Sequence, residues 1–178
     1  MDQPILFLDI DGVCNCRSFL RANRPKDETD LRTWAPMLNK NMVARINRIT
    51  DEAGADIVVV SDWRGYGETN VLYQTLREGG LTGNFIGVTP IVHQTRRDIE
   101  TSHWIGQTFG WGDEARISEL RFAAIDDNAH LYPTIRGRVI QTSYETGITD
   151  GHVRMALKMM KEPIGEKVTQ ALRPSSAV

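Results

Sequence analysis

The sequence predicts an α/β protein with a Rossmann-like three-layer sandwich, in which helices cover both faces of a central, mainly parallel sheet of five strands. Two observations lead to this prediction. Short apolar runs alternate along the chain with segments in which apolar residues recur at helical spacing. In addition, the run IVVV at residues 57–60 is apolar and β-branched at every position, which is typical of a strand buried on both faces of a parallel sheet.

The first part of the chain predicts one strand and one helix. Residues 5–10 are apolar and are expected to form a buried strand, whereas residues 15–36 are charged and poor in aliphatic side chains. A helix is expected to follow Asn39, a suitable N-cap, and to end at Gly54. The apolar residues that recur between them at helical spacing are Met42, Ile46, Ile49 and Ala53.

The rest of the chain continues the alternation. Further strands are predicted at residues 57–60, 84–88, 122–125 and 138–141. A helix is predicted at residues 68–77, ended by Gly79 and Gly80. Another is predicted at residues 95–109, with Ile99 and Ile105 facing inward. A last helix is expected after the N-cap Thr149, and its apolar face carries Val153, Leu157 and Met160. From Pro163 onward the chain is expected to be loose, so we divide it into a domain at 1–162 and a tail at 163–178.

Composition and charge narrow the class of protein. With 178 residues, the chain is long enough for one domain with a substantial core. Its net charge of −2 gives no long-range attraction to nucleic acid or to an anionic membrane, although a balanced total can hide a local basic patch. We expect no membrane partner, because no apolar run approaches the roughly 20 residues that span a bilayer. We expect no secretory signal, because the N-terminus lacks a basic segment followed by a long apolar stretch. Cys14 and Cys16 are too few and too close to brace a fold, so a cytoplasmic location is expected.

Polar side chains follow three of the predicted strands, at the point where each strand ends. In open parallel sheets, ligands bind outside the carboxyl ends of the strands. Three strands are therefore expected to deliver five carboxylates and one hydroxyl to the same edge. These residues are Asp9 and Asp11 after the first strand, Ser61 and Asp62 after the second, and Asp126 and Asp127 after the fourth.

Carboxylates crowded at one edge repel each other unless a cation or raised pKa values relieve them. Magnesium is the expected cation, since it prefers oxygen ligands and no cluster of His or Cys favours zinc. One carboxylate could also attack an electrophile, and a second, two residues on, could act as general acid, while Gly12 lets the backbone turn close to a substrate. Taken alone, D-x-D-G fits a surface turn equally well. The polar residues after the other two strands favour the functional interpretation.

The segments FLDIDG, VVVSDWR and FAAIDD resemble the motifs of the haloacid dehalogenase-like (HAD) superfamily. The resemblance implies that Asp9 is a nucleophile that forms an aspartyl-phosphate and that Asp11 is the general acid/base. It implies a phosphate contact from Ser61, and we expect Asp62 and Gly12 to bind the phosphate as well. The implied Mg²⁺ ligands are Asp9, Asp11, Asp126 and Asp127, the last as a second ligand or as an orienting partner of Asp126.

A third motif of the superfamily supplies a Lys or Arg that neutralises phosphoryl charge, and Arg96 and Arg97 are the candidates. The ordered series D-G-V-x-N, S-x-W-R, G-V-T-P, R-x-x-E and T-G-I-T is similar to the HAD branch found in Swiss Army knife RNA-repair proteins. In that comparison Arg97 takes the third-motif position. Cys14 stands where a leucine is expected, which removes no catalytic group.

The presence of Asp11 favours phosphoryl transfer over carbon–halogen hydrolysis, which needs no acid at that position. The short segment 13–38 is expected to be a flap, with a minimal cap domain or none, so that an open site admits a nucleotide or a nucleic-acid terminal phosphate. Arg64 is expected to bind substrate phosphate or ribose, or alternatively to form a salt bridge. Trp34 either stacks on a base or docks on the core. A non-catalytic module that binds a phosphorylated ligand or a protein partner is the alternative function.

Overall fold

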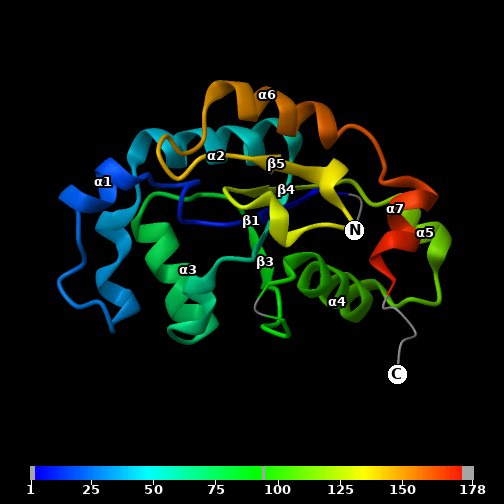
Figure 1. The fold of residues 1–178 in the computed structure, drawn as a ribbon, viewed down its shortest axis with the longest axis horizontal. Helices are drawn as coiled ribbons and strands as arrows, with labels where there is room; N and C mark the ends of the chain where they lie inside the picture. Colours follow the sequence, from blue (N-terminus) through cyan, green and yellow to red (C-terminus); the bar gives the residue numbers. More distant parts are fainter. Residues whose placement is uncertain (1–2, 94, 174–178) are drawn as a thin grey trace.

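Five parallel strands form one sheet in the computed structural model, which describes residues 3–93 and 95–173 (Figure 1). The strands lie in the order β3-β2-β1-β4-β5, and every neighbouring pair is parallel. Their bounds are β1 Ile5–Leu8, β2 Asp56–Val59, β3 Phe85–Val88, β4 Phe122–Asp126 and β5 Val139–Gln141. The predicted fold class is therefore confirmed: the protein is a Rossmann-like α/β sandwich.

Seven α-helices surround the sheet within the described residues. They are α1 Arg17–Ala22, α2 Lys40–Ala53, α3 Thr69–Glu78, α4 Arg97–Phe109, α5 Glu114–Ser118, α6 Asp150–Met159 and α7 Gly165–Leu172. Short 3-10 turns accompany them at η1 Leu31–Thr33, η2 Ala35–Met37, η3 Asp62–Gly65, η4 Ala129–Leu131 and η5 Arg136–Arg138. Figure 1 shows α2 and α6 side by side on one face of the sheet and α4 on the other.

The two faces of the sheet are buried in two separate hydrophobic clusters. Along β1, Leu6 and Leu8 belong to the cluster formed with α2, α3 and α6, while Ile5 and Phe7 belong to the cluster formed with α4, α5 and α7. Successive residues of a strand point to opposite faces, so a strand covered on both sides must be apolar at every position. This explains the run at residues 57–60, all of which are fully buried.

The helix boundaries follow the capping residues that the sequence predicted. The Asn39 side chain accepts hydrogen bonds from the backbone N–H groups of Asn41 and Met42, at 3.0 and 3.3 Å, and so begins α2. Gly54 ends it with φ +62°, a left-handed conformation that glycine adopts without steric cost. Thr149 caps α6 in the same way.

Three short helices were not predicted. α1 and α5 lie in segments that the sequence left without an element, and α7 lies in the segment that was expected to be loose. That expectation is wrong for residues 165–172, because Ile164 and Leu172 are buried against α4 and α5. Residues 174–178 of the predicted tail lie outside the described residues. Ile99, expected to face inward, is half-exposed, whereas Ile105 is buried as predicted.

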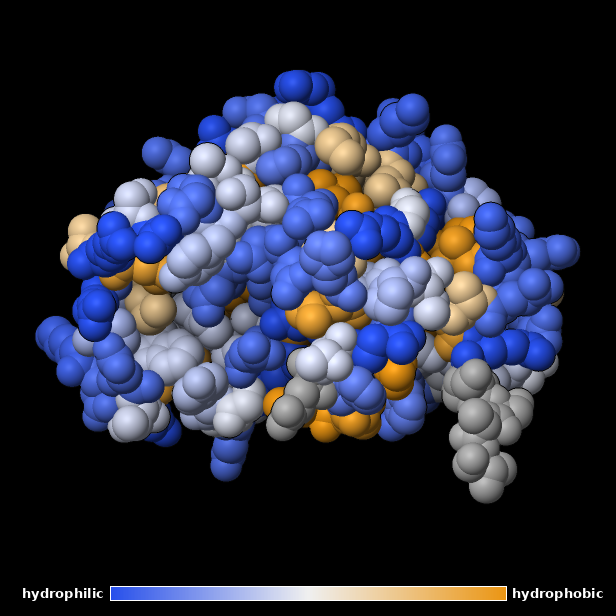
Figure 2. All heavy atoms as spheres, in the orientation of Figure 1, coloured by the Kyte–Doolittle hydropathy of each residue, from blue (hydrophilic) through white to orange (hydrophobic). Residues whose placement is uncertain are grey.

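The surface seen in Figure 2 is largely hydrophilic, with small, separate hydrophobic areas. Among the residues that the structure describes, no helix has the length and apolar character needed to cross a lipid bilayer.

Candidate active site

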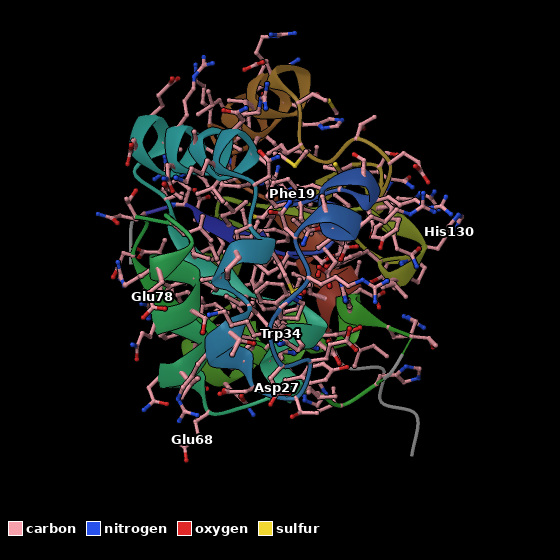
Figure 3. All side chains as sticks on the ribbon, turned by 90° about the vertical axis from the view of Figure 1, so that its left-hand side faces the viewer. Phe19, Asp27, Trp34, Glu68, Glu78 and His130 are labelled. Atoms are coloured by element: carbon pink, nitrogen blue, oxygen red, sulfur yellow. The ribbon has the colours of Figure 1, made fainter. Side chains whose placement is uncertain are left out.

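The carboxyl ends of β1, β2 and β4 meet at one edge of the sheet, on the side of the molecule that faces the viewer in Figure 3. Asp9 directly follows β1, and its backbone N–H donates to the carbonyl of Ile125 at 3.0 Å, which extends the ladder by one residue. Ser61 follows β2, and Asp126 is the last residue of β4. All three are buried, so the fold holds them in fixed positions.

Three carboxylates form a cluster at this edge. Asp9, Asp126 and Asp127 each offer an oxygen atom, and these oxygens lie within 4.8 Å of one another. Burial and then the charge of Asp126 raise the pKa of Asp9 to about 8, and the same two causes raise the pKa of Asp127. A set of oxygen donors whose negative charges are this poorly compensated fits a hard cation such as Mg²⁺.

Arg97, the first residue of α4, supplies positive charge to the cluster. Its Nη1 lies 3.1 Å from Asp9 Oδ1 and 2.5 Å from Asp126 Oδ2. Burial lowers the pKa of Arg97, but the carboxylates of Asp9 and Asp126 raise it by more, so the guanidinium stays charged. Arg96 instead pairs with Asp98, at 2.8 Å. The structure thus brings Arg97, and not Arg96, to the candidate nucleophile.

The carboxylate of Asp11 is held beside the cluster by two hydrogen bonds. The indole Nε1–H of Trp63 donates to its Oδ2 at 2.9 Å, and the amide of Asn15 donates to its Oδ1 at 2.8 Å. The cluster of mutually close oxygens does not include Asp11, so a ligand role for this carboxylate stays a prediction. The sequence did not predict the part that Trp63 plays in orienting Asp11.

Gly12 allows Asp127 to approach the loop after β1. Its φ is +69°, and a Cβ atom built there would lie 2.5 Å from Asp127 Oδ2, well inside van der Waals contact. The carbonyl of Gly12 accepts a hydrogen bond from Thr142 Oγ1 at 2.6 Å, which ties this loop to the end of β5. The glycine is therefore required both by the backbone conformation and by the close approach of a cluster member.

Ser61 and Asp62 lie at the carboxyl end of β2, as predicted. Ser61 is buried and caps η3, where its Oγ accepts from the backbone N–H of Trp63 at 3.4 Å. The Asp62 side chain is 84% exposed and is 3.2 Å from Arg97 Nη2. Among the residues that the structure describes, Arg97 thus links Asp62 to the cluster.

Asp126 has a further partner that the sequence did not reveal. The hydroxyl of Tyr132 donates to Asp126 Oδ2 at 2.8 Å, and the backbone N–H of Asn128 donates to Oδ1 at 2.8 Å. Burial and the charge of Asp126 raise the pKa of Tyr132 well above its ordinary range, so this hydroxyl remains a donor. Nothing in the sequence around Tyr132 marks it as a site residue.

Arg64 forms a buried ion pair with Glu100, and its Nη1 donates to the carbonyl of Ser61 at 2.7 Å and also to that of Val60. The side chains of Arg64 and Glu100 are 3% and 2% exposed. This is the salt-bridge alternative that the sequence left open, and it joins the end of β2 to α4. A direct contact between Arg64 and a substrate stays a prediction.

Trp34 lies near the centre of the edge seen in Figure 3, and it is docked rather than free to stack on a base. It is only 6% exposed, and its ring packs against Trp63 and Tyr66 at centroid distances of 5.1 and 4.8 Å. Its Nε1–H donates to the carbonyl of Asp27 at 3.2 Å. The flap at residues 13–38 is therefore anchored by a packed aromatic group beside Asp11.

A comparison with protein families is consistent with this geometry. The family model described as "HAD domain in Swiss Army Knife RNA repair proteins" matches residues 5–153, a span that contains every residue of the site described above. No curated protein and no solved structure was found to match the chain.

Proposed function

This chain belongs to the family of HAD domains in Swiss Army Knife RNA repair proteins, and from that premise we propose that it is a magnesium-dependent phosphomonoester hydrolase. One observation carries the proposal. The buried carboxylate of Asp9 lies against Arg97 within a cluster of acidic residues, and a second carboxylate, Asp11, is oriented two residues along the chain. These contacts support a nucleophile, a cation site and a proton carrier at one edge.

The acidic cluster of Asp9, Asp126 and Asp127 would hold Mg²⁺ through carboxylate oxygens. When bound, the ion neutralises negative charge on the transferring phosphoryl oxygens. Arg97 supports the same function from the protein, since it is buried, charged and in contact with Asp9. The hydroxyl of Ser61 and the backbone around Gly12 are the further groups that we assign to the phosphoryl oxygens.

In the first step, an Asp9 oxygen attacks phosphorus, and the bond from phosphorus to the leaving-group oxygen breaks. Asp11 donates its proton to that oxygen, so the substrate leaves as an alcohol. Trp63 and Asn15 hold the Asp11 carboxyl group in one orientation for this transfer. The product of the step is an acyl phosphate on Asp9.

In the second step, water attacks the phosphorus of the Asp9 acyl phosphate, and Asp11, now ionised, accepts a proton from it. The bond from phosphorus to the Asp9 oxygen breaks, inorganic phosphate leaves, and both carboxyl groups return to their starting states. In both steps, the ion pair between Asp126 and Arg97 keeps the guanidinium of Arg97 in place.

The substrate that we propose is a nucleotide or a nucleic-acid terminal phosphate. Residues 65–84, between β2 and β3, carry α3, and residues 13–38 carry α1 and two 3-10 turns, so neither segment builds a separate domain over the site. A phosphate at the end of a long chain could therefore reach Asp9. The family description, which refers to RNA repair proteins, supports the same class of substrate.

A phosphate-release screen tests the proposal. The substrates are nucleoside monophosphates, sugar phosphates, and oligonucleotides that carry a 3′- or a 5′-phosphate, each with Mg²⁺ and with a chelator. We expect release from nucleotides and oligonucleotide ends that needs Mg²⁺ and is absent in Asp9→Asn. Full activity in chelator would reject the metal, and no release from any phosphomonoester would leave the non-catalytic binding module as the better account.

A further inference from the structure

Exposed apolar side chains gather at the same edge of the sheet as the acidic cluster. Among the described residues, five large hydrophobic side chains are strongly exposed, and four of them lie in segments that follow the carboxyl ends of β2, β3 and β5. These four are Tyr66, Ile91, Val92 and Tyr144, with exposures between 43% and 59%. Because the ligand of such a sheet lies outside these strand ends, the position of the four residues points to contact with a ligand.

Two of the four, Tyr66 and Tyr144, line one cavity of about 480 Å³ together with the flap. The flap contributes Trp34 at the wall and a set of charged and apolar side chains from α1 and the loop after it. The complete lining is Arg17, Leu20, Arg21, Arg24, Pro25, Glu28, Trp34, Met37, Tyr66 and Tyr144. We call this cavity the flap pocket.

The flap pocket is joined to the candidate catalytic residues by packed aromatic rings. Tyr66 packs on Trp34, and Trp34 packs edge-on against Trp63, whose indole N–H donates to Asp11. Tyr66 follows Asp62 by four residues on the same turn after β2. A single extended ligand could therefore fill the pocket and present a phosphate at the cluster.

The charge of the flap pocket favours an anion. Three arginines line it against one glutamate. Arg17 pairs with Glu145 at 2.8 Å and Arg24 lies 3.7 Å from Glu28, but these pairs are exposed to water and are easily exchanged for a ligand. The side chain of Arg21 makes no hydrogen bond or ion pair with any other residue that the structure describes.

We propose that the flap pocket binds a nucleoside of a single-stranded polynucleotide, with its base against the rings of Tyr66 and Tyr144 and a backbone phosphate against Arg21. Exposed aromatic rings beside arginines are the pairing that binds unpaired bases and their phosphates. A single strand is required because a base within a duplex is already stacked, and a cavity of about 480 Å³ has no room for a double helix. The proposal rests on the proposed function only where it places the terminal phosphate at Asp9.

Binding of an oligonucleotide without a terminal phosphate tests the flap pocket separately from catalysis. The probe is a fluorescently labelled single-stranded hexanucleotide with hydroxyl ends, followed by anisotropy. We expect a Kd of about 10⁻⁴–10⁻⁶ M for the wild type. Tyr66→Ala and Tyr144→Ala should each weaken binding roughly 5- to 150-fold, and Tyr66→Phe should restore it because the ring is kept. Arg21→Ala should lower the slope of log K against log salt by about 0.7.

Two control variants match the test variants in exposure but lie elsewhere. Met155 is exposed on α6, and Arg136 is exposed in η5, before β5 and thus at the opposite edge of the sheet. Met155→Ala and Arg136→Ala should leave the affinity unchanged. Circular dichroism of all variants would confirm that each is folded.

Several results would overturn the proposal: no binding at about 1 mM protein, equal affinity in the tyrosine variants and the controls, or equal affinity for a hairpin duplex. Inorganic polyphosphate is a further probe. If polyphosphate binds with the same affinity as the hexanucleotide, the pocket is a general anion site and the proposal is overturned. Hydrolysis of an aryl phosphate by the wild type is measured in parallel. If the wild type does not hydrolyse the aryl phosphate but still binds the hexanucleotide through its bases, the proposed function is rejected and the proposal for the flap pocket is kept. If it hydrolyses the aryl phosphate but shows no such binding, only the proposal for the flap pocket is rejected.

Discussion

Gly12 and Gly54 have nearly the same backbone conformation but different surroundings, which makes them a matched pair. Their φ angles are +69° and +62°. A Cβ at Gly12 would collide with Asp127, whereas a Cβ at Gly54 would meet no described residue within 4 Å apart from its chain neighbours. Gly12→Ala should therefore displace a member of the acidic cluster, and Gly54→Ala should not.

We expect Gly54→Ala to lose about 1–2 kcal/mol of the free energy of unfolding, the usual cost of a left-handed residue with a side chain. Gly12→Ala should lose more, because the collision with Asp127 adds to that cost. Only Gly12→Ala should also lose Mg²⁺ affinity and activity. Urea unfolding and titration calorimetry with Mg²⁺ are the measurements. Unchanged Mg²⁺ binding in Gly12→Ala would show that Asp127 is not needed for the metal.

Trp63 is expected to act on catalysis through Asp11. Trp63→Phe keeps most of the buried ring but removes the N–H that donates to Asp11. We expect kcat to fall about 10- to 100-fold because the acid is no longer held in one orientation. Trp111→Phe, just after the C-terminal end of α4, is the control and should keep the wild-type kcat. A normal kcat in Trp63→Phe would mean that packing is the only role of this indole.

The strand ends led us to expect five carboxylates at one edge, and three of them, Asp9, Asp126 and Asp127, form the cluster there. The resemblance, rather than the strand ends, selected Arg97 over Arg96, and Arg97 is the arginine that contacts Asp9. The sequence did not predict the hydrogen bonds from Trp63 to Asp11 or from Tyr132 to Asp126. The first of these contacts joins residues 52 positions apart, and the direction of an indole N–H depends on packing that no local pattern encodes. Only Asn15, within D-G-V-x-N, carried a signal in its motif.

At the level of elements, the buried pair of Arg64 and Glu100 joins the turn after β2 to α4, the helix that carries Arg97. Burial raises the pKa of Glu100, although Arg64 opposes the shift. Glu100→Gln would leave a buried guanidinium without its counter-charge, so we expect a loss of about 3–5 kcal/mol in the free energy of unfolding.

The exposed pair of Arg48 and Glu52 on α2 provides the comparison, with both side chains 49% exposed. Glu52→Gln should cost less than about 1 kcal/mol, because water screens a pair of this kind. Urea unfolding of both variants is the measurement. Losses of equal size would contradict a structural role for the pair of Arg64 and Glu100.

Elements with capping residues and a continuous apolar face, such as α2, were predictable, and the short ones were not. α1 has six residues and buries none of them, so it leaves no apolar periodicity to detect. α5 has five residues. α7 does carry a signal, since Ile164, Val168 and Leu172 recur every four residues and pack on one cluster. Polar residues separate these three apolar positions, so the segment has no continuous apolar run.

At the scale of the whole molecule, the acidic cluster makes the stability of the folded protein depend on pH and on bound metal. Asp9 has an ordinary pKa of 3.8 and a pKa of about 8 in the folded protein without metal. Between these values the folded protein keeps a proton that the unfolded chain has lost. Without metal, the contribution of Asp9 to stability is therefore complete below pH 3.8 and is lost as the pH rises towards 8.

Mg²⁺ requires the ionised carboxylate, so its binding must displace this proton. We expect Mg²⁺ affinity to rise about tenfold per pH unit between pH 6 and 8, and the increase of Tm at a fixed Mg²⁺ concentration to grow accordingly. Asp9→Asn should show no such growth. A Tm increase that is the same at pH 6 and at pH 8 would show that Asp9 is already ionised without metal.

Trapping of the phosphoenzyme tests the central claim most directly. Wild-type protein, Asp9→Asn and Asp11→Asn are mixed with an activated aryl phosphate and Mg²⁺ and quenched rapidly in acid, and the modified peptide is mapped by mass spectrometry. We predict a phosphoryl group on Asp9 in the wild type and none in Asp9→Asn. In Asp11→Asn the phosphoenzyme should accumulate, because the aryl leaving group needs little acid whereas the attacking water still needs a base. Wild-type turnover in Asp9→Asn, or a phosphoryl group on any other residue, would contradict the account.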